Sequence, residues 1–134
     1  MKKNFLILLA ACLLALLTTN TVSAQSNRVE KRITPVKGKK LVLKGAVRDG
    51  DEVAYRFKGR AGQTVNVKII GRDADFSVYL IYGLDAQLIT EDTKNWTGKL
   101  PADFNGTCEI AVHSTYKLAD YRLKILLKRR NRKT

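Results

Sequence analysis

Apolar and polar residues alternate with a period of two along most of this chain, most clearly at residues 51–70. Three apolar side chains alternate with polar ones on each side of a connection at residues 59–62, which carries two glycines. Strict alternation places one set of side chains on a buried face and the other in solvent. The pattern predicts a β-hairpin, and a hairpin needs a second apolar layer to be stable.

The same alternation recurs before and after this hairpin, with glycine-rich or polar turns between the runs. No segment shows convincing helical periodicity, and no internal repeat is present. Short strands at regular spacing predict an all-β fold, an antiparallel sandwich or barrel of about eight strands. The further strands are expected at residues 41–47, 76–82, 87–91, 96–100, 107–113 and 120–128.

The predicted faces of these strands define a core and a surface. In residues 107–113, Cys108 is expected to be buried, whereas Glu109, Ala111 and His113 are expected to face solvent. Tyr55, Tyr82 and Tyr121 are expected inside, and Tyr79, Tyr116 and Trp96 are the candidates for exposed aromatic residues. The predicted core comprises Val53, Tyr55, Phe57, Val65, Val67, Ile69, Val78, Leu80, Cys108, Ile110, Val112, Tyr121, Leu123 and Ile125.

Residues 1–24 are predicted to be a signal peptide rather than part of the fold. Two lysines precede an apolar run, and small residues end at Ala24, where cleavage is expected. One alternative is a retained membrane anchor, for which the apolar run is short. Another is lipidation at Cys12, within a lipobox-like stretch. The expected organisation is a signal peptide at 1–24, a basic segment at 25–40, a β-sandwich at 41–128 and a basic tail at 129–134.

The net charge of +13 is concentrated near the two ends of the chain. Residues 25–40 carry +5 and residues 128–134 another +5, whereas residues 41–127 carry only +1. Terminal charge runs are typically solvated. Export makes nucleic acid an unlikely partner. The alternative role for these basic segments is contact with an anionic envelope surface, such as phosphorylated polymers or lipid headgroups.

The composition offers little for catalysis. His113 is the single histidine, so no usual zinc set can be assembled, and no nucleophile-elbow, P-loop or H-E-x-x-H motif is present. After signal removal only Cys108 remains, which leaves no intramolecular disulfide and favours a core cysteine over a reactive one. We therefore expect a protein that is not an enzyme and that has no cofactor.

The acidic residues of two turns provide one alternative to this expectation. Carboxylates clustered on loops can bind calcium, which takes about six to eight oxygen ligands. A carboxylate pair of the glycosidase type is the other possibility that counting leaves open, although no cleft is recognisable. The acidic residues concerned are Asp49, Asp51, Glu52, Asp73 and Asp75.

Four short motifs follow one another in a recognisable order. They are Y-R-F at 55–57, A-G-Q-T-V at 61–65, L-P-A at 100–102 and Y-R-L at 121–123. This set resembles the bacterial pre-peptidase C-terminal domain group, in which an A-G-Q hairpin precedes an L-P-containing loop and a closing Y-x-L strand. Cys108 stands where that pattern usually has tyrosine.

The resemblance covers roughly residues 41–127 and implies a jelly-roll-like β-sandwich that is usually non-catalytic. Small exported members of the group are similar to the periplasmic inhibitors of g-type lysozyme. The resemblance thus implies a periplasmic or secreted binding module. The most specific function that it implies is inhibition of g-type lysozyme. The alternative is an accessory domain that binds a cell-envelope glycan or peptidoglycan.

The candidate partner-binding residues are Arg48, Arg72, Tyr116 and Lys117. They lie in three predicted turns that share one end of the sandwich if one connection crosses over, as a jelly roll requires. Together they would present one aromatic ring and three cations flanked by carboxylates. Tyrosine and arginine are the residue types that most often anchor protein interfaces.

Overall fold

A computed structural model describes residues 27–128, and within this range it contains nine β-strands and no helix. Alternation of apolar and polar side chains accounts for most of these strands, because each has one face on a core. The strands are β1 (Arg28–Arg32), β2 (Leu41–Arg48), β3 (Glu52–Lys58), β4 (Thr64–Ile70), β5 (Ala74–Tyr82), β6 (Asp85–Thr93), β7 (Asn95–Lys99), β8 (Thr107–Ser114) and β9 (Leu118–Lys128).

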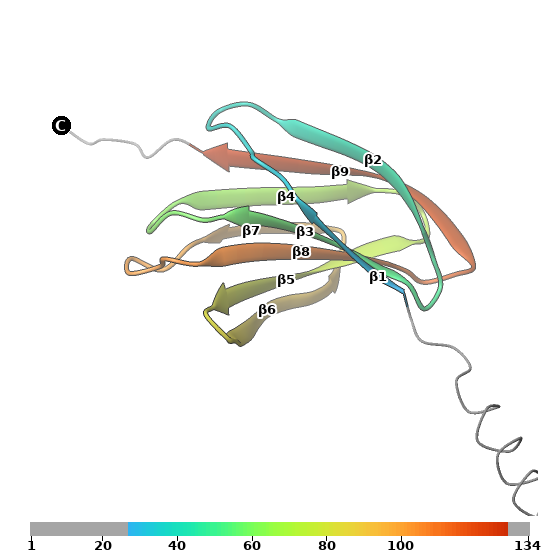
Figure 1. Cartoon of the computed structure of the whole chain (residues 1–134). Helices are drawn as coiled ribbons and strands as arrows, with labels where there is room; N and C mark the ends of the chain where they lie inside the picture. The colour runs from blue at the N-terminus through green and yellow to red at the C-terminus, as the bar shows by residue number, and fades with distance from the viewer. Residues whose placement is uncertain (1–26, 129–134) are drawn as a thin grey trace, which may run out of the picture.

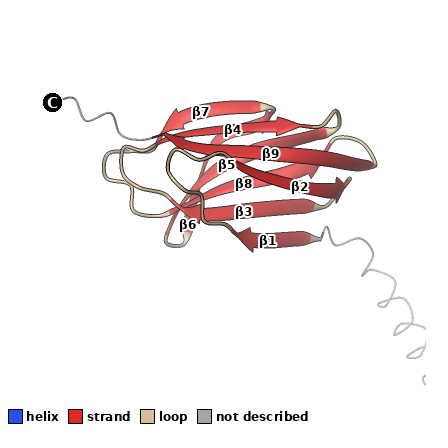
Figure 2. Cartoon of the chain, turned by 90° about the horizontal axis from the view of Figure 1, so that it is seen from above, coloured by secondary structure: helices blue, strands red, loops and turns tan. Residues whose placement is uncertain are grey.

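Two sheets pack face to face, as Figures 1 and 2 show. One sheet has the order β1-β3-β8-β5-β6 and the other has the order β2-β9-β4-β7. Every pair of neighbouring strands is antiparallel except β1 and β3, which are parallel. The predicted all-β sandwich is confirmed, with nine strands in place of about eight.

The additional strand is β1, from the segment that we expected to be a solvated basic run before residue 41. Residues 28–32 are exposed, as expected, but they form a strand that pairs with β3 in register from Arg28 opposite Glu52 to Arg32 opposite Arg56. Hydrogen bonds continue the pairing at both ends, with Glu52 N–H donating to the Asn27 carbonyl and Ile33 N–H to that of Arg56. The predicted start of the sandwich at residue 41 is therefore wrong, because the first strand begins at Arg28, thirteen residues earlier.

The core lies between the two sheets and matches the prediction closely. All predicted core residues are buried except Val53, which is half-buried at its edge. Phe76, Leu100 and Phe104 are also buried, although Leu100 and Phe104 flank or lie in a loop. Phe104 meets Tyr82 edge-on, with ring centroids 5.3 Å apart. Tyr82 itself is 37% exposed, so the expectation that it is a core residue is wrong.

β8 departs from the predicted alternation. Glu109 and Ala111 were expected in solvent, but both are buried, and His113 is half-buried. The reason is position, because β8 is the central strand of its sheet and is flanked by β3 and β5. Side chains of the neighbouring strands shield the outer face of a central strand, and periodicity alone does not report this.

Two tyrosines join the sheets inside the core. The hydroxyls of Tyr55 on β3 and Tyr121 on β9 are 2.7 Å apart. Burial, followed by this hydrogen bond, raises the pKa of Tyr121 well above its usual range. Gly45 on β2 gives the ring its space, since a Cβ at that position would lie 2.5 Å from the Tyr121 hydroxyl. Gly45 therefore marks a close approach and not the bulge or bend that a glycine in a strand often signals.

The connections divide between two ends of the sandwich (Figure 1). The three-turn end holds the β2–β3, β4–β5 and β8–β9 turns, at residues 49–51, 71–73 and 115–117. The basic end holds the β1–β2 segment at residues 33–40, the β3–β4 turn at residues 59–63 and the last residues of β9.

Several predictions concern residues outside the described range. They are the signal peptide at 1–24, its cleavage after Ala24, lipidation at Cys12 and the basic tail at 129–134. Among residues 27–128, no helix has the length and apolar character needed to cross a membrane.

Candidate functional site

The three turns of the three-turn end are held together by their main chains. Asp49 N–H donates to the Lys117 carbonyl at 2.5 Å, which joins the β2–β3 and β8–β9 turns. Thr115 donates to the Asp73 carbonyl from both its N–H, at 2.8 Å, and its hydroxyl, at 3.1 Å. The expected meeting of these turns at one end is therefore observed, and the β8–β9 turn lies between the other two.

Lys94, in the β6–β7 connection, braces the β4–β5 turn. Its ammonium donates to the carbonyls of Gly71, Arg72 and Ala74 and pairs with the Asp75 carboxylate at 3.0 Å. Gly71 also fits this turn closely, because a Cβ there would lie 2.5 Å from the Asp120 carbonyl oxygen. The backbone that carries Arg72 is thus fixed from two sides.

The four predicted residues project from this frame into solvent. Arg48, Arg72, Tyr116 and Lys117 are all exposed, and Tyr116 is 58% exposed. The Lys117 ammonium lies 5.4 Å from the centroid of the Tyr116 ring, within the range of a cation–π interaction. None of the three cations has an ion-pair partner among residues 27–128. The structure brings the four residues to one end, and their binding role stays a prediction.

Three of the five acidic residues predicted in these turns have side-chain partners within the chain. Asp51 accepts a hydrogen bond from Asn27 N–H at 3.2 Å, Glu52 pairs with Arg28 at 3.3 Å, and Asp75 pairs with Lys94. Within the described range, no three His, Cys, Asp or Glu side chains are grouped so that they could hold a metal ion. Calcium binding by these turns was an alternative prediction, and it stays untested.

The sequence analysis missed an ionic network on the outer face of the five-stranded sheet. Glu109 is only 4% exposed. It accepts a hydrogen bond from Arg56 Nε at 2.9 Å and another from the Arg28 guanidinium. Burial acts to lower the pKa of Arg28, but its hydrogen bond to Glu109 and the charges of Glu109, Glu52 and Glu30 outweigh burial and raise it. Both arginines bind the same carboxylate oxygen, Glu109 Oε1, so the charge of Glu109 is paired within the fold. No local signal reveals this network, because it depends on the pairing of β1 with β3.

The two residues weighed for chemistry have structural positions. Cys108 is fully buried, as predicted, and burial raises the pKa of its thiol to about 12, with a smaller contribution from Glu109. His113 Nε2 lies 2.6 Å from Asp92 Oδ1, so the histidine side chain links β8 to β6. Cys108 thus lacks the exposure of a reactive thiol, and within residues 27–128 His113 belongs to no group of three potential metal ligands.

Of the aromatic residues considered for exposure, Tyr116 alone is exposed. Trp96 is half-buried and packs against the core, where its ring lies over Gly98, since a Cβ there would be 2.2 Å from the ring. Tyr79 is half-buried on the outer face of its sheet, and burial followed by nearby carboxylates raises its pKa. The described residues therefore present no row of exposed rings of the kind that stacks on a sugar chain.

Comparisons with known proteins identify structural relatives. No family model matches the sequence, and a search of curated proteins finds no relative. Among solved structures, the chain is similar to Aeromonas hydrophila PliG, a periplasmic inhibitor of g-type lysozyme, with 26% identity, a TM-score of 0.65, and coverage of 77% of this chain and 99% of that one.

Two further structures are similar. The Salmonella Typhimurium PliG, also a periplasmic inhibitor of g-type lysozyme, has 23% identity, a TM-score of 0.58, and coverage of 75% of this chain and 98% of that one. A pre-peptidase C-terminal domain of Bacillus anthracis collagenase has 11% identity, a TM-score of 0.45, and coverage of 77% and 98%. The chain is thus similar in fold to the periplasmic inhibitors of g-type lysozyme, as its motifs predicted.

Proposed function

We propose that this protein is an exported, non-enzymatic inhibitor of g-type lysozyme that acts in the periplasm. The observation that carries the proposal is the match to the Aeromonas hydrophila inhibitor, at 26% identity over 99% of that chain. Because the match covers 99% of that chain, it supports a shared role more than a match to a small part of a chain would. The ionic network around Glu109 and the burial of Cys108 support the non-enzymatic part of the proposal.

The three-turn end is the surface that we propose to meet the enzyme. Arg48, Arg72 and Lys117 are exposed there and have no acidic partner among residues 27–128, and the turns are tied together by hydrogen bonds. Most glycoside hydrolases work with a pair of carboxylates in the cleft. Arginine and lysine side chains on a rigid frame suit such a cleft, because a pre-ordered frame loses little entropy on binding.

An inhibition panel tests the function class. The purified mature protein is mixed with g-type, c-type and i-type lysozymes, and separately with insoluble peptidoglycan. Selective loss of g-type activity supports the proposal. Sedimentation with peptidoglycan without inhibition would support the glycan-binding alternative instead, and turnover of a glycan substrate would contradict the non-enzymatic assignment.

A double variant tests the proposed surface. Arg72→Ala with Tyr116→Ala removes one cation and the exposed ring, and we expect inhibition to weaken by at least about tenfold, as interface anchors do. The matched control, Lys99→Ala with Leu84→Ala, removes one cation and one fully exposed apolar side chain at the other end. Inhibition that survives the first change intact would show that another surface binds the enzyme, even if the protein is an inhibitor.

A further inference from the structure

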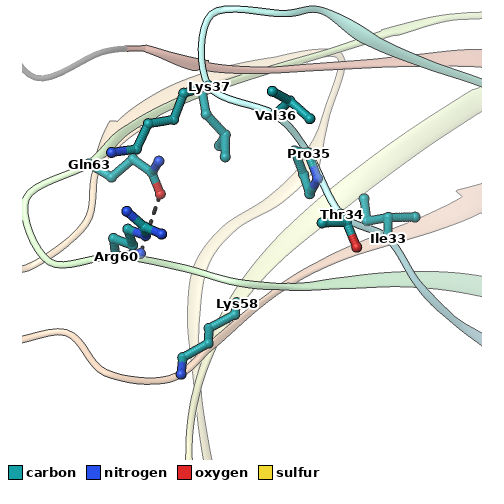
Figure 3. A pocket seen from close by; sticks show the side chains of 9 residues that line it. Ile33, Thr34, Pro35, Val36, Lys37, Lys58, Arg60 and Gln63 are labelled. Atoms are coloured by element: carbon teal, nitrogen blue, oxygen red, sulfur yellow. Dashed lines mark hydrogen bonds between the residues drawn. The ribbon is translucent and has the colours of Figure 1, made fainter.

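The basic end contains a cavity that the proposed inhibitor surface does not use. It lies between the β1–β2 segment and the β3–β4 turn, has a volume of about 620 Å³ and is partly open to solvent (Figure 3). A neighbouring hollow of about 200 Å³ shares Lys37, Arg60 and Gln63 with it and is completed by Lys128. We call the two together the basic cavity.

All charged side chains that line the basic cavity within residues 27–128 are cations. They are Lys37, Lys58, Arg60 and Lys128, and no ion-pair partner is found for them in this range. Figure 3 shows the Lys37 ammonium and the Arg60 guanidinium on the same side as the Gln63 carboxamide, whereas Lys58 extends away along the rim. Like charges gathered without a counter-charge repel one another, and an anion relieves that repulsion.

Gln63 adds a directed donor to these charges. It is 6% exposed, and its Oε1 accepts the Arg60 N–H at 3.3 Å. Because a backbone N–H can only donate, this bond fixes which end of the carboxamide is the oxygen. The Nε2 group therefore lines the cavity as a donor, with no hydrogen-bond partner in the described part of the chain.

The main chain holds this donor in place. Gln63 N–H donates to the Arg60 carbonyl at 3.1 Å, and Leu100 N–H donates to the Gln63 carbonyl at 2.8 Å. The donor thus lies on a closed turn and needs little reordering to meet an acceptor. A preorganised amide donor beside a guanidinium and two ammonium groups is suited to the several acceptor oxygens of one anionic group.

We propose that the basic cavity binds a phosphate group carried on a larger molecule. Arginine matches the geometry of phosphate oxygens, lysine adds charge, and the Gln63 amide adds a neutral donor. Apolar side chains also line the cavity, namely Ile33, Pro35, Val36 and Leu127. Figure 3 shows Ile33, Pro35 and Val36, with Thr34, across the cavity from Arg60 and Gln63. An apolar lining of this kind suits the carbon-rich part of a phosphorylated compound, whether that compound is a lipid or a soluble phosphate ester.

The test measures phosphate binding at fixed ionic strength. Inorganic phosphate is titrated into the mature protein in a calorimeter, with chloride adjusted to hold the ionic strength at about 0.1 M, so that screening stays constant. Saturable binding is expected, and its absence would overturn the proposal. The double variant Lys37→Gln with Arg60→Gln should bind at least about tenfold more weakly, since charge-assisted hydrogen bonds are lost.

Two further variants separate the cavity from general charge. Gln63→Glu keeps an oxygen for the Arg60 N–H but replaces the donor with a negative oxygen, so phosphate binding should disappear while the melting temperature is retained. The control Lys44→Gln with Lys68→Gln removes two exposed lysines from β2 and β4 of the four-stranded sheet, outside the basic cavity. It should change the affinity for phosphate less than twofold. Equal weakening in this control and in the cavity variants would overturn the proposal, because any positive surface would then suffice.

Vesicles identify the source of the phosphate. Sedimentation with phosphatidylglycerol vesicles, compared with phosphatidylcholine vesicles, is measured for the same proteins. Binding to the anionic vesicles that falls in the cavity variants supports a lipid headgroup as the ligand. Vesicle binding that the cavity variants leave unchanged, together with lost binding of inorganic phosphate, supports a soluble phosphate ester.

Discussion

The two ends of this sandwich are built from the same nine strands and differ in how they are closed. At the three-turn end, short turns hydrogen-bond to one another, and cations and carboxylates alternate along them. At the basic end, the β1–β2 and β7–β8 connections are longer, the side chains of Leu100 and Phe104 are buried, and cations are the only charged side chains that line the cavity within the described range. Main-chain hydrogen bonds hold the turns of the three-turn end while their side chains project into solvent. At the basic end, the longer β1–β2 segment and the β3–β4 turn enclose a cavity.

This difference is the basis for proposing different partners for the two ends. A display of exposed side chains with mixed charge suits a large protein surface, where a few anchors supply most of the binding energy. A hollow with converging donors suits a small charged group.

The largest effect is expected from removing the side chain that closes the basic end. Phe104→Ala should lower the free energy of unfolding by about 3–5 kcal/mol, because a buried ring is lost and a cavity remains. Tyr116→Ala at the three-turn end removes a ring that is 58% exposed and should change it by less than about 0.5 kcal/mol. Urea unfolding with unchanged m-values measures both, and similar losses at the two ends would contradict the comparison.

An intermediate effect is expected from the brace of the three-turn end. Lys94→Met removes the ammonium that bonds three carbonyls and the Asp75 carboxylate, which should cost about 1–2 kcal/mol, since the side chain is partly exposed. Lys99→Met, at the other end of β7, is the control and should cost less than about 0.5 kcal/mol. Equal urea midpoints for the two variants would show that Lys94 does not hold the turn.

The sequence predicted the strands that bury one face, because alternation reports burial on one side directly. It missed β1, whose sequence R-V-E-K-R has no apolar face and which is held by pairing with β3 and by ion pairs to Glu109 and Glu52. It also missed the burial of Glu109 and the role of Phe104, because both depend on segments that are distant in sequence. Periodicity describes one strand at a time, and these features arise between strands.

For the candidate site, the meeting of the three turns was predictable from the way connections alternate between the ends of a sandwich. The side chains Arg48, Arg72, Tyr116 and Lys117 are exposed there, as turn residues usually are. The basic cavity was not predicted, since it forms only where the β1–β2 segment folds beside the β3–β4 turn. Its cations were visible in the sequence only as part of a terminal charge run and as isolated residues of the body.

The smallest effect concerns the interior beneath the basic end. Cys108 pairs in register with Phe57 and Leu80, near the ends of their strands at the basic end. Nearby cations lower the pKa of a thiol when their field reaches it, yet burial raises the pKa of Cys108 from its ordinary value of 9.0 to about 12. The fold therefore keeps the Cys108 thiol protonated to a higher pH than the unfolded chain does, and the pH dependence of stability tests this.

A thiol with a raised pKa holds its proton more tightly in the folded state than in the unfolded state. Stability is therefore unaffected well below pH 9 and falls as the pH rises from about 9 toward 12, because the unfolded state loses its proton first. From pH 9 to pH 10 the free energy of unfolding should fall by about 1 kcal/mol more in the unmodified protein than in Cys108→Ala. Urea unfolding at the two pH values measures the difference. The raised pKa values of Tyr79 and Tyr121 also make the free energy of unfolding fall as the pH rises. This contribution is the same in both proteins and cancels in the comparison. A parallel decline in the two proteins would mean that the Cys108 thiol titrates near its ordinary value in the fold, and that burial does not raise its pKa.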